Sequence, residues 1–541
     1  MDNISFSQRD EDGRIPKESD VETPILIPIH ATSTHSDFMK KRMAYYSTVL
    51  LLLYLSWVLS FSLVCSQNDL PVKAASIGNW LLIEGWMKPS LFDGIPNKDL
   101  LDGTQVQFMS TQQKKYLSAE NGGGKNLIIN GSSASSSETF RLWRINETFF
   151  NLRVSNKQFV GLENEGQGSK LVAVSTSPKS SEIFQIIRKE DDKNRVHLQA
   201  SNGQFLQVKS DADITADGNG SSWDDDDPSV FTMIIGSGLQ GEYQLTNGYG
   251  PDKAPQIMKD HWNTYITEED FNFMSQNGIN AVRIPIGWWI MYDPNPPKPF
   301  VGGSLEALDN AFKWSEKYKL KVIVDLHGLR VSQNGFAHSA SRDGFQEWGS
   351  SDIQETVDII DFLAKRYANQ PSLLAIELMN EPRSPGTNLD DLKKFYKDGY
   401  DAVRKYTKDA YVIFSNRLGG DLKELISFSN SFSRVVIDIH MYNLFWMGFD
   451  NMTVQQNIDY IYNSRGSDIK SVSDQGPLVF IGEWTSEWDV KNASKEDYQK
   501  FAKAELEVYG RASFGWAYWA YKCDEIHWSL KWMIENRFIM L

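Results

Sequence analysis

From Gly236 onward, short apolar runs alternate with longer helix-like stretches, and this alternation constrains the fold more than any other feature. Seven such runs occur, at residues 279–286, 321–327, 373–380, 411–415, 434–440, 477–483 and 513–519. Strands that alternate with helices form parallel sheets, and strands buried on both faces are apolar throughout. Residues 76–84 (SIGNWLLIE) supply an eighth run upstream. The pattern predicts an α/β fold, specifically a (β/α)8 TIM barrel.

A threefold internal repeat lies between the first run and the other seven. Tyr116, Phe159 and Phe205 occupy equivalent places, 43 and 46 residues apart. A second aromatic residue follows each of them after 24 to 26 residues, at Phe140, Phe184 and Phe231. Three β-rich units of about forty residues, with turns rich in Gly, Asn and Ser, indicate a β-trefoil. The trefoil is therefore expected as an insertion after the first barrel strand, and its repeats resemble the fascin-like domain.

These patterns predict five regions. They are a polar N-terminal extension (1–43) that we expect to be disordered, a signal peptide or signal anchor (44–66), the first barrel strand with a linker (67–100), the fascin-like β-trefoil (101–236) and the remainder of the catalytic barrel (237–541).

The region from Ala44 to Cys65 is uncharged for 22 residues and follows a cluster of Lys and Arg. It is long enough to span a bilayer. A cleavable signal peptide is the preferred interpretation, because small residues precede Gln67 where cleavage would occur, and a type II membrane anchor is the alternative. Both place the remaining chain in the lumen or outside the cell, so we expect a secreted, cell-wall protein. Five N-glycosylation triplets agree with that location.

Composition narrows the classes of partner. The net charge of −15 argues against nucleic acid and anionic membranes as partners. Two cysteines and scattered histidines provide no disulfide framework and no zinc-ligand spacing, and no glycine-rich phosphate loop is present, so neither a metal nor a cofactor is expected. The 17 tryptophans favour a ligand that stacks on flat rings, as sugars do.

Polar side chains stand in or just after six of the predicted barrel strands. They are Arg283, His327, Asn380, Glu381, His440, Tyr442, Glu483 and Trp519. Loops at the carboxyl ends of barrel strands surround one cavity, so we expect these side chains to converge there. Burying so many polar groups without partners would cost several kcal/mol, roughly, which makes a purely structural role hard to explain.

Two glutamates on strands four and seven suit the cleavage of a glycosidic bond with retention. Glu381 would be the general acid/base, and Glu483 the nucleophile. Arg283 and Tyr442 would keep Glu483 ionised. Asn380 would bond the sugar 2-hydroxyl, and Trp519 would lie beneath the apolar face of the sugar.

The motifs that carry these residues resemble glycoside hydrolase family 5. They are RIPIGWW, DLHG with SQNG, LMNEP, HMY, GEW and WAYW, and the resemblance spans residues 76–94 and 236–541. The exo-1,3-β-glucanases of that family are the most similar group, and the fascin-like insertion followed by HWSLKWMIEN resembles its plant branch. The resemblance implies a retaining, exo-acting glucan 1,3-β-glucosidase without a cofactor, and it adds Glu84 as a sugar-binding residue.

Several alternatives stay open at this stage. A transglucosidase, an endo-acting β-glucanase and a β-mannanase would use the same catalytic residues, because loops determine specificity. A non-catalytic carbohydrate-binding protein and an actin-bundling protein are alternatives of other classes. For the trefoil itself, a carbohydrate ligand and a purely structural role are both possible.

Three departures from the family pattern affect the substrate pocket. Leu329, Arg330 and Val331 replace a small turn-forming stretch and add a cation beside the pocket. Ala337 stands where the family often has an acidic residue, with His338 next to it. Asn79 replaces a glycine. Exo specificity is therefore less firmly indicated than the catalytic pair.

Overall fold

In a computed structural model of the protein, residues 71–541 are described, apart from 165 and 167. The proposed leader at 44–66 lies outside this part of the chain. No helix within the described residues is both long and apolar enough to cross a membrane.

Eight parallel strands close into a barrel, which confirms the predicted fold class. In chain order they are β1 (Val72–Ser76), β14 (Ala281–Gly287), β15 (Lys321–Gly328), β16 (Leu373–Glu377), β17 (Tyr411–Ser415), β18 (Val435–His440), β19 (Leu478–Trp484) and β20 (Gly515–Tyr518). The barrel closes because β1 pairs with β14 on one side and with β20 on the other. Ala74 is opposite Ala281 in the first pairing and opposite Ala517 in the second.

The first strand was predicted in the wrong place. The apolar segment 76–84 was expected to form it, but β1 is Val72–Ser76 and most of that segment follows the strand. Leu81 and Ile83 are nevertheless buried, since Leu81 forms an isolated bridge with Ile286 of β14 and the backbone N–H of Ile83 donates to the Glu242 side chain of α2. Periodicity cannot distinguish a short buried strand from a buried irregular segment that follows it.

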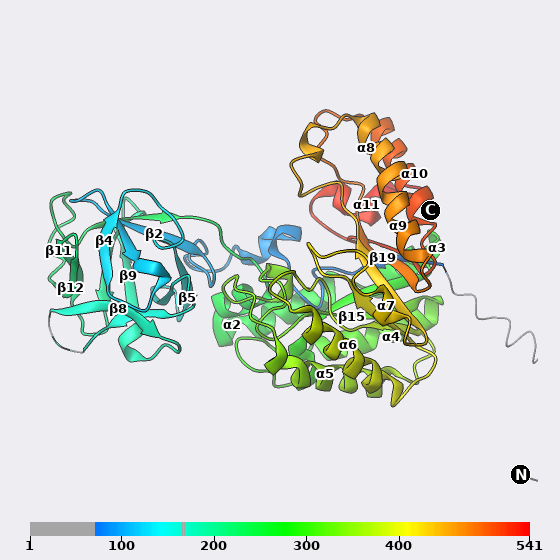
Figure 1. The fold of residues 1–541 in the computed structure, drawn as a ribbon, viewed down its shortest axis with the longest axis horizontal. Coiled ribbons are helices and arrows are strands. Elements are labelled where there is room, and N and C mark those ends of the chain that lie inside the picture. Colours follow the sequence, from blue (N-terminus) through cyan, green and yellow to red (C-terminus); the bar gives the residue numbers. More distant parts are fainter. Residues whose placement is uncertain (1–70, 165, 167) are drawn as a thin grey trace, which may run out of the picture. The chain divides into compact units, whose positions relative to one another are not determined.

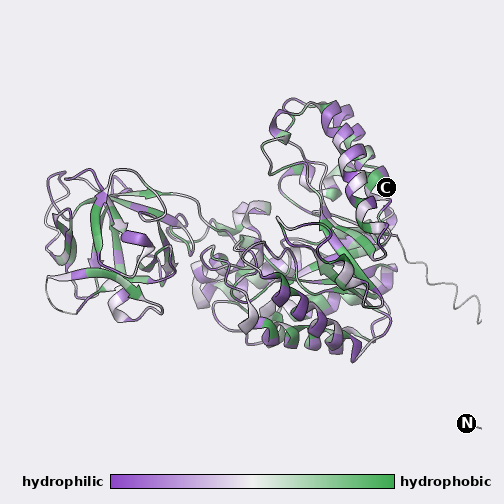
Figure 2. Cartoon of the chain, in the orientation of Figure 1, coloured by the Kyte–Doolittle hydropathy of each residue, from purple (hydrophilic) through white to green (hydrophobic). Residues whose placement is uncertain are grey.

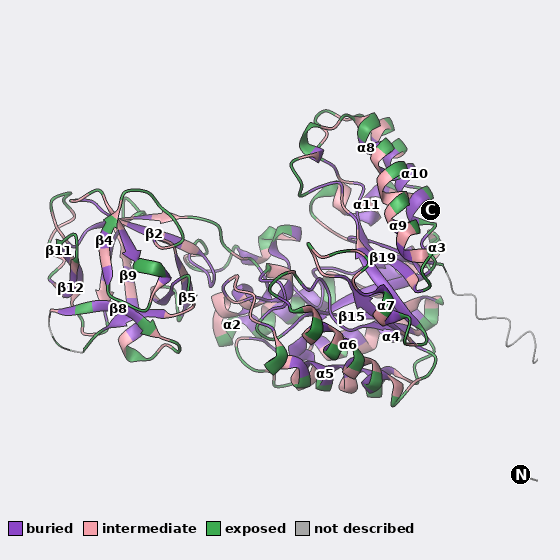
Figure 3. Ribbon diagram, in the orientation of Figure 1, coloured by how far each residue is buried: buried purple, intermediate pink, exposed green. Residues whose placement is uncertain are grey.

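Helices cover the outside of the barrel (Figure 1). They are α2 (Glu242–Thr264), α3 (Glu268–Gln276), α4 (Ser304–Tyr318), α5 (Ile353–Tyr367), α6 (Leu389–Arg404), α7 (Ile426–Ser429), α8 (Val454–Tyr460), α9 (Gly466–Ser473), α10 (Lys495–Tyr509) and α11 (Leu530–Glu535). The strands are apolar and buried while the outer helix faces are polar and exposed, as Figures 2 and 3 show. This division arises because each strand is covered by side chains inside the barrel and by helices outside it.

Twelve antiparallel strands between β1 and α2 form the predicted all-β insertion. They are β2 (Gln105–Ser110), β3 (Tyr116–Ala119), β4 (Leu127–Gly131), β5 (Phe140–Arg144), β6 (Phe149–Arg153), β7 (Phe159–Leu162), β8 (Ser169–Ser175), β9 (Phe184–Arg188), β10 (Arg195–Ala200), β11 (Phe205–Ser210), β12 (Asp213–Gly218) and β13 (Phe231–Ile235). Each repeat contributes four strands.

The repeated aromatic residues mark equivalent strands of the trefoil. Tyr116, Phe159 and Phe205 begin β3, β7 and β11. The second set begins β5, β9 and β13. Phe140, the first residue of β5, is fully buried in a hydrophobic core that belongs to the insertion itself.

Candidate active site

The predicted site residues meet at the carboxyl ends of the barrel strands. Register explains part of this convergence, since His440 of β18 lies directly opposite Glu483 of β19. Both lie at the same end of the barrel as Glu381, which follows β16. One ligand-type atom from each of Glu381, His440 and Glu483 lies within 4.8 Å of the others. The two glutamates therefore lie close to one another at the same end of the barrel.

Glu483 has the partners of an ionised carboxylate. Arg283 donates from Nη1 to its Oε1 at 3.0 Å, and Tyr442 donates from its hydroxyl to Oε2 at 2.7 Å. The Glu483 side chain is buried, so these two donors replace the water that would otherwise solvate the charge.

Arg283 is fully buried and is held by groups that the sequence analysis did not single out. Its Nε and Nη2 donate to the two oxygens of Glu377 at 2.8 and 3.1 Å, and Nη2 also lies 3.1 Å from Asp325. Asn380 accepts from Nη2 at 2.8 Å. Burial raises the pKa of Glu377 well above its ordinary value, although the charge of Arg283 opposes this. These contacts fix the guanidinium in the orientation that reaches Glu483.

Glu381 has a different environment, in which both carboxylate oxygens contact imidazole nitrogens. His440 Nδ1 lies 2.7 Å from Oε1, and His338 Nε2 lies 3.1 Å from Oε2. Burial raises the pKa of Glu381, but hydrogen bonds and charge from His338 and His440 outweigh it and hold that pKa well below its ordinary value. The backbone of Glu381 is left-handed (φ 45°), which is uncommon for a residue with a side chain and typical of functional sites.

The two imidazoles hold protons beside Glu381. Burial alone would lower the pKa of His338, but the hydrogen bond and charge of Glu381 raise it to about 9. The charges of Glu483 and Asp438 likewise overcome burial and raise the pKa of His440 well above its ordinary value. Asp438 bonds the other nitrogen of His440 at 2.8 Å. At neutral pH a transferable proton is therefore available on each side of the Glu381 carboxylate.

The remaining predicted residues lie close to the same group of side chains. His327 is held by Asp325 at 2.7 Å and by Asn380 at 3.2 Å, and its ring stacks on Trp519 with centroids 5.4 Å apart. Trp86 donates from Nε1 to Oε2 of Glu84 at 2.9 Å. Among the described residues none hydrogen-bonds to the buried Oε1 of Glu84.

Aromatic rings continue from Glu84 toward Glu483. Trp528 lies 5.0 Å from Trp86 and 5.8 Å from Tyr442, measured between ring centroids. Phe445 lies 5.6 Å from Tyr442 and is 81% exposed. Such a row of partly exposed rings offers apolar faces on which sugar rings can stack.

The departures from the family pattern have local explanations. Arg330 turns away to pair with Glu355 of α5 at 2.6 Å, so its charge is balanced there. Asn79 adopts φ 58°, where asparagine is tolerated better than most residues, and its side chain accepts from the Glu84 backbone at 2.8 Å. Ala337 offers no polar group, but the neighbouring His338 does, and its Nε2 contacts Glu381.

Sequence reasoning missed some of the polar network. Asp325, Glu377 and Asp438 were not singled out, although each is a charged residue inside an apolar strand and could have been noticed for that reason. The contact between His338 and Glu381 depends on the path of a long loop and had no pattern to indicate it.

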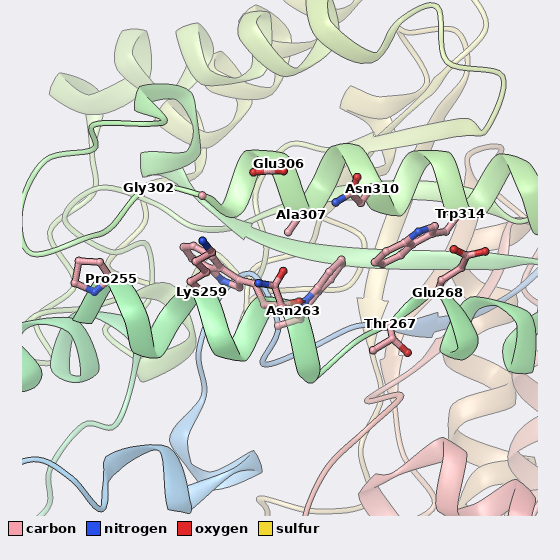
Figure 4. Close-up of a pocket in the computed structure, with 13 residues that line it drawn as sticks. Pro255, Lys259, Asn263, Thr267, Glu268, Gly302, Glu306, Ala307, Asn310 and Trp314 are labelled. Carbon is pink, nitrogen blue, oxygen red and sulfur yellow. The ribbon is translucent and has the colours of Figure 1, made fainter. Parts of the chain in front are cut away.

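A pocket lies on the outer surface of the barrel, between α2 and α4 (Figure 4). Its volume is about 560 Å³, and Lys259 of α2 and Trp314 of α4 are among its lining residues. None of the predicted site residues is among the described residues that line it, so this pocket is separate from the candidate site.

Comparison with known proteins identifies a family whose reaction agrees with the geometry of this site. The model of the family "Cellulase (glycosyl hydrolase family 5)" matches residues 247–525, which is more than half of the chain. This chain belongs to glycosyl hydrolase family 5. It is accordingly an O-glycosyl hydrolase that acts on β-glycosides with retention of configuration.

The matches to curated relatives cover most of each relative's length. A probable glucan 1,3-beta-glucosidase A of Aspergillus fumigatus is 31% identical over 57% of this chain and 82% of the relative. A glucan 1,3-beta-glucosidase of Blumeria graminis is 32% identical over 57% of this chain and 80% of the relative. Among solved structures, a rutinosidase from Aspergillus niger is 18% identical with a TM-score of 0.49, covering 55% of this chain and 88% of that one. The insertion matches a domain of unknown function, DUF7910, at residues 97–235.

Proposed function

We propose that this family 5 member is an exo-acting glucan 1,3-β-glucosidase in which Glu381 is the acid/base and Glu483 the nucleophile. One observation carries the assignment of roles. The two carboxylates approach within 4.8 Å, yet Glu483 receives hydrogen bonds from an arginine and a phenol whereas Glu381 is bonded by imidazoles. An approach this close fits the separation of about 5–5.5 Å that retention requires and not the roughly 6.5–9.5 Å of inverting enzymes.

In the first step, an oxygen of Glu483 attacks the anomeric carbon and the bond to the leaving oxygen breaks. His338 or His440, whose ring nitrogens lie 3.1 and 2.7 Å from the Glu381 oxygens, first passes a proton to Glu381, which donates it to the leaving oxygen and is left as a carboxylate. In the second step, Glu381 accepts a proton from water, the water oxygen attacks the anomeric carbon, and Glu483 is released. Arg283 and Tyr442 stabilise the departing carboxylate charge in that second step.

Two further groups support binding of a β-linked glucosyl unit. Glu84 presents a buried carboxylate oxygen without a protein partner among the described residues, and the row from Trp86 to Phe445 supplies stacking faces. The curated relatives named as glucan 1,3-beta-glucosidases support 1,3-β-glucan as the substrate. The apolar leader supports a secreted or membrane-anchored protein with the barrel outside the cytoplasm.

Replacement of the nucleophile tests the mechanism. Glu483→Ala should abolish turnover of an aryl β-glucoside, because no group remains to form the glycosyl-enzyme. Added azide should restore part of the rate by attacking from the vacated side, and the product should be an α-glycosyl azide. A β-glycosyl azide, identified by NMR, would contradict the assigned role of Glu483.

A product time course tests the substrate and the mode of attack. With a laminarin-type 1,3-β-glucan, we expect glucose as the sole early product, because an exo enzyme removes terminal units. Mixed oligosaccharides at early times would indicate an endo-acting enzyme, and longer glucans would indicate transglucosylation. Faster release from mannan than from glucan would instead favour a β-mannanase, and binding of glucan without any product would favour a non-catalytic carbohydrate-binding protein.

A further inference from the structure

The trefoil contacts the barrel at the loop that connects β15 to α5, residues 329–352. Two trefoil side chains reach the same carboxylate oxygen of this loop. Arg153, at the end of β6, lies 2.7 Å from Oδ2 of Asp343, and Trp143 of β5 donates to it from Nε1 at 2.5 Å. Asp343 is 2% exposed, so these two donors take the place of water around its carboxylate.

Further contacts extend this attachment along the loop. Arg153 also binds both oxygens of Glu347, at 3.0 and 3.1 Å. Arg141 donates to the backbone carbonyl of Asp343, and its guanidinium lies 4.4 Å from the centre of the Phe345 ring. The trefoil thus supplies cations and the loop supplies anions, in an interface that excludes most water around Arg153 (9% side-chain exposure).

The attached segment is bonded to the part of the loop that lies in the active site. The backbone N–H of Glu347 donates to the carbonyls of Val331 and Ser332 at 3.1 and 3.2 Å. Ser332 in turn bonds Ser339 through their hydroxyls at 2.5 Å. Ser339 is adjacent to His338, so the segment held by the trefoil and the imidazole belong to one hydrogen-bonded unit.

The same unit contacts Glu381 twice. His338 Nε2 lies 3.1 Å from Oε2, and Asn334 Nδ2 donates to the backbone carbonyl of Glu381 at 3.1 Å. A shift of the loop would therefore change both the hydrogen bonding of the carboxylate and the position of its backbone.

We infer that the trefoil positions the acid/base: Arg153 and Trp143 are positioning residues that act through Asp343 and Glu347 on the loop that sets His338 and Asn334 against Glu381. The inference rests on the proposed function, since it assigns the trefoil to the residue that supplies the proton. It requires no ligand of the trefoil.

The test is Arg153→Met in the full chain, with kcat/KM measured for aryl β-glucosides that differ in leaving-group ability. A poor leaving group such as phenol needs the proton, whereas dinitrophenol does not. We expect a loss of about tenfold or more with the phenyl glucoside and less than about twofold with the dinitrophenyl glucoside. Arg153→Lys, which keeps the charge, should recover part of the loss.

Arg195→Met is the matched control. Arg195 is a trefoil arginine that pairs with Asp225 at 2.8 Å and donates to the Trp223 carbonyl at 2.6 Å, both inside the trefoil. Its replacement should leave the leaving-group dependence unchanged. The same dependence in Arg195→Met, or equal losses for both glucosides in Arg153→Met, would overturn the inference. If Arg153→Met does not fold, Asp343→Asn gives the same readout with less change in volume.

Glu381→Ala separates failure of this inference from failure of the proposed function. A steep leaving-group dependence in Glu381→Ala with none in Arg153→Met would overturn only the positioning role. Equal losses in Glu381→Ala for both glucosides would remove the acid/base role, and the inference with it.

Discussion

At the scale of single residues, the two glutamates differ in the kind of donor that each receives. Glu483 is bound by Arg283, whose guanidinium stays charged across the working pH range, and His440 lies 3.4 Å from its other oxygen. Glu381 is held by two imidazoles, those of His338 and His440, whose protons can leave. The proposed acid/base is therefore the glutamate with an imidazole at each carboxylate oxygen.

Replacing His338 should change how stability depends on pH. The pKa of His338 is raised to about 9 from an ordinary value of 6.5, so the folded state binds the proton more tightly than the unfolded state. Its contribution is fully present below pH 6.5 and is lost as pH rises through about 9. Over that window the difference in unfolding free energy between wild type and His338→Gln should shrink by on the order of 2–3 kcal/mol.

Chemical denaturation at several pH values measures this difference. His197→Gln is the control, because the His197 ring is buried against the carbonyls of Ser222 and Ser229 rather than against a carboxylate. A difference between wild type and His338→Gln that stays constant from pH 6.5 to 10 would show that His338 holds no such proton.

The residues at the strand ends could be predicted because polar side chains stand out at the end of an otherwise apolar strand. Arg283, Glu381, His440 and Glu483 each stand out in that way, and the structure brings them together. Asp325 and Glu377 could have been noticed as charged residues inside apolar strands, but their pairing with Arg283 could not be predicted, since the strands lie far apart in sequence. His338 could not be placed either, because its contact depends on how residues 329–352 fold.

At the scale of elements, barrel closure depends on a close approach between β1 and β20. Gly515, which begins β20, has φ 123°, and a Cβ built on it would lie 2.1 Å from the carbonyl oxygen of Val72. Backbone atoms cannot move aside as a flexible side chain can. The seam where the barrel closes therefore requires glycine at this position.

Gly515→Ala should lower the free energy of unfolding by about 3 kcal/mol or more, from the strained φ together with the clash. Gly349→Ala is the matched control, because a Cβ there would have no neighbour within 4 Å and its φ is extended (−163°). Denaturant titration compares the two. Equal stability of both variants would show that the seam can open to admit a side chain.

The seven later strands were predicted to within a few residues, because alternation with helices gives each strand clear limits. The first strand was misplaced because residues 76–84 have the same apolar composition as a strand but form the buried segment after it. The trefoil repeat was easier to predict from the sequence, since aromatic residues recur at the start of equivalent strands.

At the scale of the whole molecule, the described residues form separate hydrophobic cores in the trefoil and in the barrel. Phe140 belongs to the first, and Phe480 lies in the interior of the barrel. Among the described residues, no buried residue belongs to both the trefoil core and the barrel core. Each core can thus lose its packing without directly opening the other.

Phe140→Ala should destabilise the trefoil by about 3–5 kcal/mol, because it removes a buried ring and leaves a cavity. In differential scanning calorimetry, the unfolding transition of the trefoil should then move to a lower temperature and separate from the main transition. Phe480→Ala, the matched substitution in the barrel, should move the main transition instead. A single transition that shifts equally in both variants would show that the trefoil and barrel unfold as one cooperative unit.

The pairing of β1 with β20 also dictates an order of events during translation. Residues 72–76 leave the ribosome early, yet their partner at 515–518 is synthesised some 440 residues later. Among the described residues, the strands of the trefoil pair only within 105–235, so they can form while most of the barrel is still being made. The nascent chain can thus complete the trefoil before the segments that carry Glu381 and Glu483 have been synthesised.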